Sequence, residues 1–253
     1  MSVMTPTRVD KIPVLRLPEA DRVAATEYQR YLDQIRTLRP NDWDKATDCT
    51  RWTVHDLVAH TVGQTEGFAS LRENARQFRL GAKVQREIGA PYPVDGINEV
   101  QVRDRRDWTP QQLIDAYAAA IPAALRFRRR LPWPLRAIPV PFAPPQIPTK
   151  PLGYIMHPVI TRDVWMHRID LWRATGAPLE LTPEHDGRIV ADLAREWSTT
   201  HNDPFDLLLT GPAGGHFVRG VGSERLEMDG TEFWRILSGR GNGDGLLAHP
   251  FPL

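Results

Sequence analysis

The chain has 253 residues, enough for one large domain or two modest ones with buried cores. Apolar residues make up 41% and charged residues 25%, which argues against extensive disorder, and the formal net charge of +1 argues against nucleic acid as a partner. Cys49 is the single cysteine, so an internal disulfide framework is excluded. We expect it to be a small packed residue rather than a nucleophile.

Export and membrane signals are not recognisable in the sequence. No run approaches the roughly 18 consecutive apolar residues of a membrane span. Residues 1–17 are an irregular lead-in, in which charges at positions 8, 10, 11 and 16 interrupt the apolar core that a signal peptide needs. One cysteine also suits a reducing compartment, so we expect a cytoplasmic protein that does not contact a membrane.

Three helices are predicted in the first half of the chain. The first covers about residues 21–38, where apolar side chains recur at helical spacing. The second begins after Thr53, which has Asp56 at the capping-box position, and is expected to continue to about residue 85. The third begins at Thr109-Pro110, a strong helix start, and runs to about residue 130. Its basic end, Arg126 with residues 128–130, is typical of a solvated helix terminus.

A proline-rich segment separates the third helix from a fourth. Residues 131–151 contain eight prolines and cannot form regular structure. Such a connection is either an interdomain linker or a crossover loop that lines a pocket. The fourth helix is predicted from near Pro158 to Gly176, with proline at its start and glycine past its end.

The pattern changes after Gly176. Thr182-Pro183 opens another helix, and three short strands are predicted at 205–209, 215–219 and 224–228. Asp229 is expected to cap a last helix over 233–237. Long helices followed by a compact module of helices and strands predict an α+β protein, with one domain at 1–176 and a smaller one at 177–253.

Side chains of metal-ligating types gather on the predicted fourth helix. Asp163, His167 and Asp170 stand at i, i+4 and i+7, so all three project from one helix face. A carboxylate and an imidazole one turn apart are two of the three ligands of an open zinc-type site, and His60 on the second helix is the candidate for the third. Asp170 either supports a ligand histidine through its other ring nitrogen or pairs with an arginine such as Arg173.

Two motifs carry a resemblance to a known family: residues 52–60 (WTVHDLVAH) and residues 161–170 (TRDVWMHRID). With the long connection before the fourth helix, they make the chain resemble the DinB-like superfamily and, more narrowly, the mycothiol-dependent maleylpyruvate isomerase family of actinobacteria. Residues 229–240 (DGTEFWRILSGR) are similar to that family's C-terminal domain. The resemblance implies an N-terminal DinB-like four-helix bundle with a long crossover and a small C-terminal sterol-carrier-like α+β domain.

The resemblance also implies a site and its cofactors. A divalent metal, with zinc expected, would be held by His60, Asp163 and His167, where the family has a histidine and a Glu-x-x-x-His pair. Aspartate is one methylene shorter than glutamate, so its carboxylate must start closer to reach the ~2.0–2.2 Å of a zinc–oxygen bond. Mycothiol would be the thiol cosubstrate, since a thiol bound to a divalent cation loses its proton. Arg240 is the candidate for a family arginine that holds the substrate carboxylate.

Three hypotheses for function follow. The first is a metal-dependent, mycothiol-using isomerase or S-transferase that acts on a small electrophilic, anionic substrate, with substrate and thiol as its partners. The second is a non-catalytic small-molecule binding or regulatory protein with a weakened metal site. The third treats Asp163 and His167 as an ordinary intrahelical pair. The fold does not decide among them, and neither the substrate nor the oligomeric state is predicted.

Overall fold

The computed structural model describes residues 5–140, 147–221, 224–249 and 251. The chain divides into two compact units, one of residues 21–179 and one that combines residues 1–20 with 180–253. The first is helical and the second contains a mixed sheet, so the predicted α+β class is confirmed. Within the described part, no helix combines the length and apolar character needed to cross a membrane.

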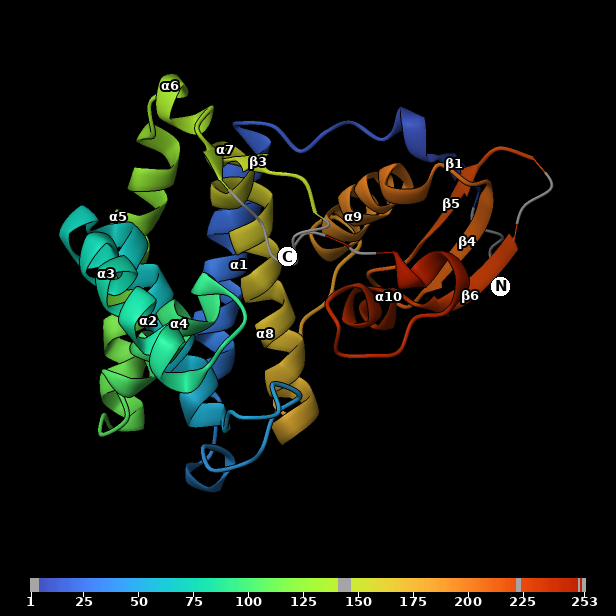
Figure 1. The fold of residues 1–253 in the computed structure, drawn as a ribbon. Coiled ribbons are helices and arrows are strands. Elements are labelled where there is room, and N and C mark those ends of the chain that lie inside the picture. The colour runs from blue at the N-terminus through green and yellow to red at the C-terminus, as the bar shows by residue number, and fades with distance from the viewer. Residues whose placement is uncertain (1–4, 141–146, 222–223, 250, 252–253) are drawn as a thin grey trace. The chain divides into compact units, whose positions relative to one another are not determined.

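The helical unit is built on a four-helix bundle (Figure 1). Its helices are α1 (Glu19–Arg36), α2 (Val54–Ala69), α5 (Pro110–Arg130) and α8 (Ile160–Thr175). Each contributes an apolar stripe to one interior, as expected for amphipathic helices that bury one face. The fully or almost fully buried side chains there include Tyr28, Tyr31, Ile35, Leu57, Val58, Val62, Leu113, Tyr117, Ile160 and Val164.

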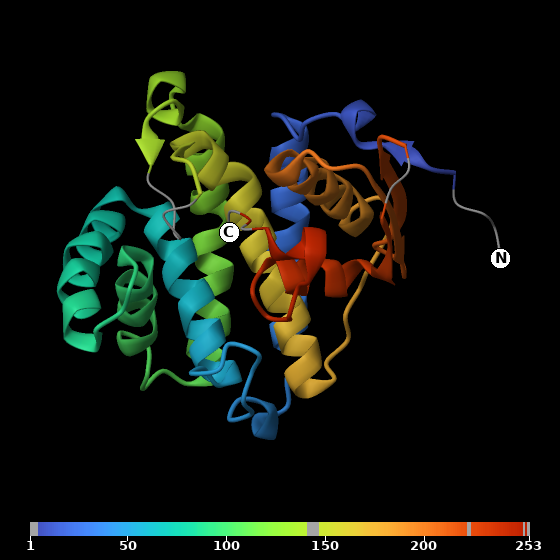
Figure 2. The same cartoon turned by 45° about the vertical axis from the view of Figure 1, so that its right-hand side comes forward.

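The predicted second helix is wrong in its length, because the helix breaks at Ser70. This residue is extended (φ −144°, ψ 116°) and ends α2, while its Oγ accepts a hydrogen bond of 3.3 Å from the Glu73 N–H and so caps α3 (Leu71–Ile88). A further helix, α4 (Pro93–Arg103), was not predicted. Helices α3 and α4 lie beside α2 (Figures 1 and 2), and glycine permits their close approach, since a Cβ on Gly96 would collide with the Gly81 carbonyl oxygen.

The proline-rich segment is a crossover within the helical unit rather than a linker between units, because residues on both sides belong to that unit. The prediction of no regular structure is wrong for part of it, since it contains α6 (Trp133–Arg136) and the two-residue strands β2 (Pro139–Val140) and β3 (Lys150–Pro151). Helix α7 (Leu152–Tyr154) and a π-helical turn (Ile155–Val159) connect this segment to α8. Of its eight predicted loop prolines, Pro141, Pro144 and Pro145 lie outside the described residues. Helix α8 follows and ends at Gly176, whose φ of 74° suits glycine.

The prediction of a solvated basic end on α5 is wrong for Arg128, which is fully buried. Its Nη2 donates to the His157 carbonyl oxygen (2.9 Å) and to Thr161 Oγ1 (2.7 Å), and its guanidinium lies 5.7 Å from the centre of the Tyr28 ring. The π-helical turn at Pro158 interrupts the ordinary helical hydrogen bonds, and Arg128 supplies a donor to a carbonyl at that interruption.

The second unit packs two helices on a four-stranded sheet (Figure 2). The sheet order is β1 (Thr7–Arg8), β5 (Gly215–Arg219), β4 (Phe205–Thr210), β6 (Glu224–Asp229); β4 and β5 are antiparallel and the other two pairs are parallel. Strand β4 alternates between buried and more exposed positions, as a half-buried strand should. Its inner face packs with α9 (Asp186–His201) and α10 (Gly230–Leu237), and the buried side chains include Phe205, Leu207, Leu209, Leu193, Trp197 and Phe233.

The three predicted strands are present as β4, β5 and β6. The last helix is present and capped as predicted, since Asp229 accepts a 2.8 Å hydrogen bond from the Thr231 N–H. The prediction of an irregular lead-in is wrong for residues 7 and 8, because they form β1, in which Thr7 pairs with Phe217 of β5. A two-residue strand has no periodicity that a sequence pattern can reveal. The units therefore group residues 1–20 with the sheet, whereas the predicted boundary divided the chain once, after residue 176.

Candidate metal centre

His60, Asp163 and His167 come together within the helical unit, His60 from α2 and the other two from α8. The Nε2 atom of His60 lies 3.7 Å from Asp163 Oδ2, and the Nε2 atom of His167 lies 3.5 Å from Asp163 Oδ1. The two imidazole rings are 5.2 Å apart and nearly perpendicular. Both histidines are buried, and a third of the Asp163 side chain is exposed. The convergence that the sequence predicts is present in the structure; metal ligation stays a prediction.

The spacing suits a tetrahedral ion. Bonds of ~2.0–2.2 Å at the tetrahedral angle place neighbouring ligand atoms about 3.4 Å apart. Each nitrogen lies only a few tenths of an ångström beyond this distance from one oxygen of Asp163, His60 Nε2 from Oδ2 (3.7 Å) and His167 Nε2 from Oδ1 (3.5 Å). The shorter aspartate side chain thus faces both nitrogens, one with each oxygen, and its ligation of a metal stays a prediction.

A chain of amides fixes the orientation of His60. The Gly63 carbonyl oxygen can only accept, so Gln77 must donate its Nε2 hydrogen to it (2.9 Å) and expose its oxygen to the Gln101 Nε2 hydrogen (2.9 Å). The Gln101 Oε1 atom then accepts from His60 Nδ1 at 2.8 Å. We assign the proton of neutral His60 to Nδ1 on this basis, which leaves the lone pair of Nε2 directed at Asp163.

Asp170 orients the second histidine. It is fully buried, and its Oδ2 atom lies 3.1 Å from His167 Nδ1. Arg173, the other partner considered for Asp170, has its Nε atom 2.6 Å from Asp48. The geometry therefore favours the supporting role over a pair with Arg173: a carboxylate that accepts from Nδ1 directs Nε2 of His167 toward the same space as Nε2 of His60.

The electrostatics also suit a cation. Burial opposes ionisation of Asp163, but the two histidines and the Gln64 Nε2 hydrogen at 2.8 Å outweigh it and hold the pKa of this carboxyl well below its usual range. Burial lowers the pKa of His60. At His167 burial acts in the same direction, but the carboxylates of Asp163 and Asp170 outweigh it and raise the pKa of His167 to about 10. A proton on His167 Nε2 thus occupies the place that a metal ion would take.

One buried atom supports the fit of a metal. Within the described part of the chain, the buried His167 Nε2 makes no hydrogen bond, and the Asp163 carboxylate at 3.5 Å is an ion-pair contact rather than a close partner. An ion between the three side chains would supply that partner. Two imidazole nitrogens and a carboxylate oxygen are the donor set of an open zinc site, in which a fourth position stays available.

Three side chains of this site were missed by the sequence reasoning. Gln64 stands four residues after His60 on the same helix face, a spacing that could have identified it. Gln101 lies on the unpredicted α4, and no local signal points from it to His60. Trp52 lies against the histidines, with its ring 4.9 Å from that of His60 and 6.5 Å from that of His167.

Arg240 belongs to the other compact unit and lies three residues after the end of α10. Its backbone N–H donates to the Arg235 carbonyl oxygen (2.9 Å), and its own carbonyl accepts from Arg235 Nη2 (3.1 Å). A role in holding a substrate carboxylate stays a prediction.

His157, a histidine at the start of the fourth helix, is buried and belongs to the π-helical turn. Burial, together with Arg128 and Arg136, lowers its pKa to about 4.

Comparison with known proteins places the chain in a family. Residues 24–172 match the family model described as the mycothiol maleylpyruvate isomerase N-terminal domain, a span that contains His60, Asp163 and His167. The crystal structure of the mycothiol-dependent maleylpyruvate isomerase is similar at 18% identity and a TM-score of 0.57, and that of its histidine-to-alanine mutant at 17% and 0.56. Each match covers 93% of this chain and 92% of the other, so the likeness in fold includes the C-terminal unit. No curated protein matches the sequence significantly. The chain belongs to the mycothiol maleylpyruvate isomerase N-terminal domain family.

Proposed function

We propose that the protein is a divalent-metal-dependent enzyme, with zinc as the metal, that uses mycothiol to isomerise or to modify a small electrophilic, anionic substrate. His60, Asp163 and His167 are the proposed ligands. The observation that carries the proposal is that both buried histidines direct Nε2 toward one carboxylate, each held by an acceptor at Nδ1. The family and the solved relatives named for mycothiol support the choice of thiol.

The protein's own side chains define how such a site works. Gln101 and Asp170 hold the two imidazoles in place, so little reorganisation is needed when an ion binds. Trp52 excludes water from one side of the His60 ring, while the partly exposed Asp163 marks the side open to solvent. A metal ion held there would supply a Lewis acid that favours the thiolate form of a bound thiol.

The thiol accounts for either reaction. A thiolate that adds to an electrophilic carbon converts a cis double bond into a single bond, about which rotation is free. If the thiolate then leaves, the double bond re-forms as trans and the thiol is regenerated, which is isomerisation; if the adduct is protonated and released, the result is S-transfer. Arg240 is the proposed partner of the substrate carboxylate, since a guanidinium binds a carboxylate through two parallel hydrogen bonds.

A non-catalytic binding protein is the second candidate. The observation in its favour is that Asp163 already accepts a hydrogen bond from Gln64 and faces both histidines, so this carboxylate has partners without any ion. The two candidates differ in metal content and in thiol-dependent turnover.

The test is metal analysis of protein purified without chelator, followed by a mycothiol-dependent assay with maleylpyruvate and related electrophiles. We expect about one zinc per chain, lost in His167→Ala together with turnover, because only two ligands remain. His157→Ala is the matched control, as it removes a buried histidine of the helical unit that is outside the site. Folded wild-type protein without metal or turnover would favour the binding protein, and a folded His167→Ala variant with undiminished metal would refute the site.

A further inference from the structure

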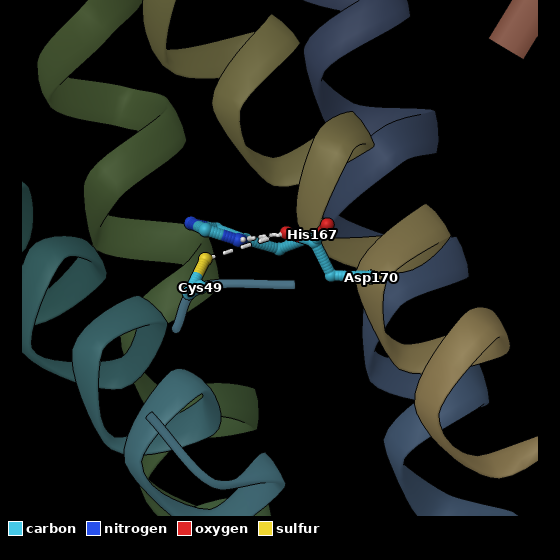
Figure 3. Close-up of side chains that lie close together, drawn as sticks. All are labelled: Cys49, His167 and Asp170. Carbon is cyan, nitrogen blue, oxygen red and sulfur yellow. Dashed lines mark hydrogen bonds and ion pairs between the residues drawn. The ribbon is translucent and has the colours of Figure 1, made fainter. Parts of the chain in front are cut away.

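A second cluster of ligand types lies on the opposite edge of the His167 ring. Figure 3 shows the side chains of Cys49, His167 and Asp170 converging, Cys49 from the loop before α2 and the others from α8. The Sγ atom of Cys49 is 3.7 Å from Asp170 Oδ2, and His167 Nδ1 is 3.1 Å from the same oxygen. One ligand atom from each of the three residues lies within 4.8 Å of the others.

Two of the three ligand pairs lie near the spacing of a coordination sphere. With metal–sulfur bonds of ~2.3 Å and metal–nitrogen or metal–oxygen bonds of ~2.0–2.2 Å, tetrahedral ligand atoms lie about 3.4–3.6 Å apart. The observed 3.7 and 3.1 Å require shifts of a few tenths of an ångström. Asp170 and His167 are buried, whereas Cys49 is only partly buried and gives an ion access to them.

We propose that Cys49, His167 and Asp170 form a second metal-ion site, for a thiophilic cation. A thiolate, an imidazole and a carboxylate together select soft or borderline ions, because thiolate sulfur binds these in preference to Mg²⁺ or Ca²⁺. Binding would release the thiol proton to solvent, as coordinated cysteine is deprotonated. This second site shares His167 with the site formed by His60 and Asp163, but its other two ligands are different.

The shared histidine makes the two sites exclusive. A neutral imidazole has one ring nitrogen with a lone pair and one with a proton. An ion beside His60 needs the lone pair on Nε2 of His167, whereas an ion beside Cys49 needs it on Nδ1, with the Nε2 proton then facing Asp163 at 3.5 Å. A thiophilic ion at Cys49 therefore displaces the ion at His60. This competition rests on the proposed function; the second site by itself does not.

The probe is Cd²⁺, whose bond to thiolate gives a charge-transfer absorption band in the ultraviolet. Because the chain has one cysteine, such a band reports on Cys49 alone. The band should form in metal-free wild-type protein and in Asp163→Asn and His60→Ala, which disable the first site but keep all three ligands of the second. It should be lost in Cys49→Ser, with folding of each variant checked by circular dichroism. Zinc-loaded wild type should release one zinc for each Cd²⁺ that generates the band.

Each outcome decides one part of the inference. A folded Asp163→Asn variant without the band, or a folded Asp170→Asn variant that forms the band at the same Cd²⁺ concentration as wild type, overturns the second site. A full band with zinc retained overturns the exclusivity and leaves the second site standing. Because Cd²⁺ binding is read without turnover, failure of the proposed isomerase or transferase activity would leave this result unchanged.

Discussion

Replacing Gln101 with methionine tests whether orientation of His60 matters to the metal centre. Methionine has a similar length and is apolar, so it fills the same space in the buried contact between α2 and α4 but cannot accept from His60 Nδ1. The lost hydrogen bond is 2.8 Å long and buried at both ends. A buried N–H left without an acceptor costs about 1–3 kcal/mol.

The imidazole can relieve that cost by carrying its proton on Nε2, which faces Asp163, instead of on Nδ1; this removes the lone pair from the place where the ion binds. Metal binding must then displace that proton, so zinc affinity should fall about 10–100-fold, the usual scale for residues that support a ligand histidine. This corresponds to about 1.4–2.7 kcal/mol of binding free energy. The free-energy cost of an unpaired buried N–H and the loss of binding free energy expected on removing a residue that supports a ligand histidine therefore fall in the same range.

The assay is competition for zinc between the protein and a chromophoric chelator at neutral pH. Gln34→Met is the matched control: it removes a buried glutamine of the helical unit that is outside the amide chain and leaves the bond between Gln101 and His60. We expect its zinc affinity to stay within a few fold of wild type. The reasoning is refuted if folded Gln101→Met binds zinc as tightly as wild type, or if both variants lose affinity equally.

Three further predictions follow from the structure and the proposed function. Because burial lowers the folded pKa of His157 to about 4, the unfolded state binds more protons between pH 4 and 6.5; stability from this group is present above pH 6.5 and is lost as the pH falls. Urea unfolding should show wild type losing about 2 kcal/mol more than His157→Asn between pH 7 and 5, and parallel losses would contradict the assignment. Asp163→Glu should retain or increase zinc content and turnover, since it restores the family's carboxylate; loss of zinc in a folded variant would show that the site is built for the shorter side chain. Arg240→Ala should raise the Michaelis constant for an anionic substrate at unchanged zinc content, and an unchanged constant would remove it from the substrate site.

The part of the proposed site on α8 could be predicted from sequence because its spacing is local. Asp163, His167 and Asp170 share one face of any helix, and the capping signals at Thr53 and Thr109 fix where two of the bundle helices begin. The long second helix was wrong because a single serine, which favours caps over helix interiors, outweighed the continuing apolar pattern at Ser70.

Other parts of the site were decided only by tertiary structure. Gln101 meets His60 across 41 residues and Cys49 meets Asp170 across 121, contacts that depend on how helices and loops pack rather than on any periodicity. The pairing of Thr7 with β5 is of the same kind. The sequence thus determined which residues face the bundle interior, because helical geometry repeats along the chain. The fold alone determined which nitrogen of each histidine is turned toward the site, because that depends on acceptors brought from distant segments.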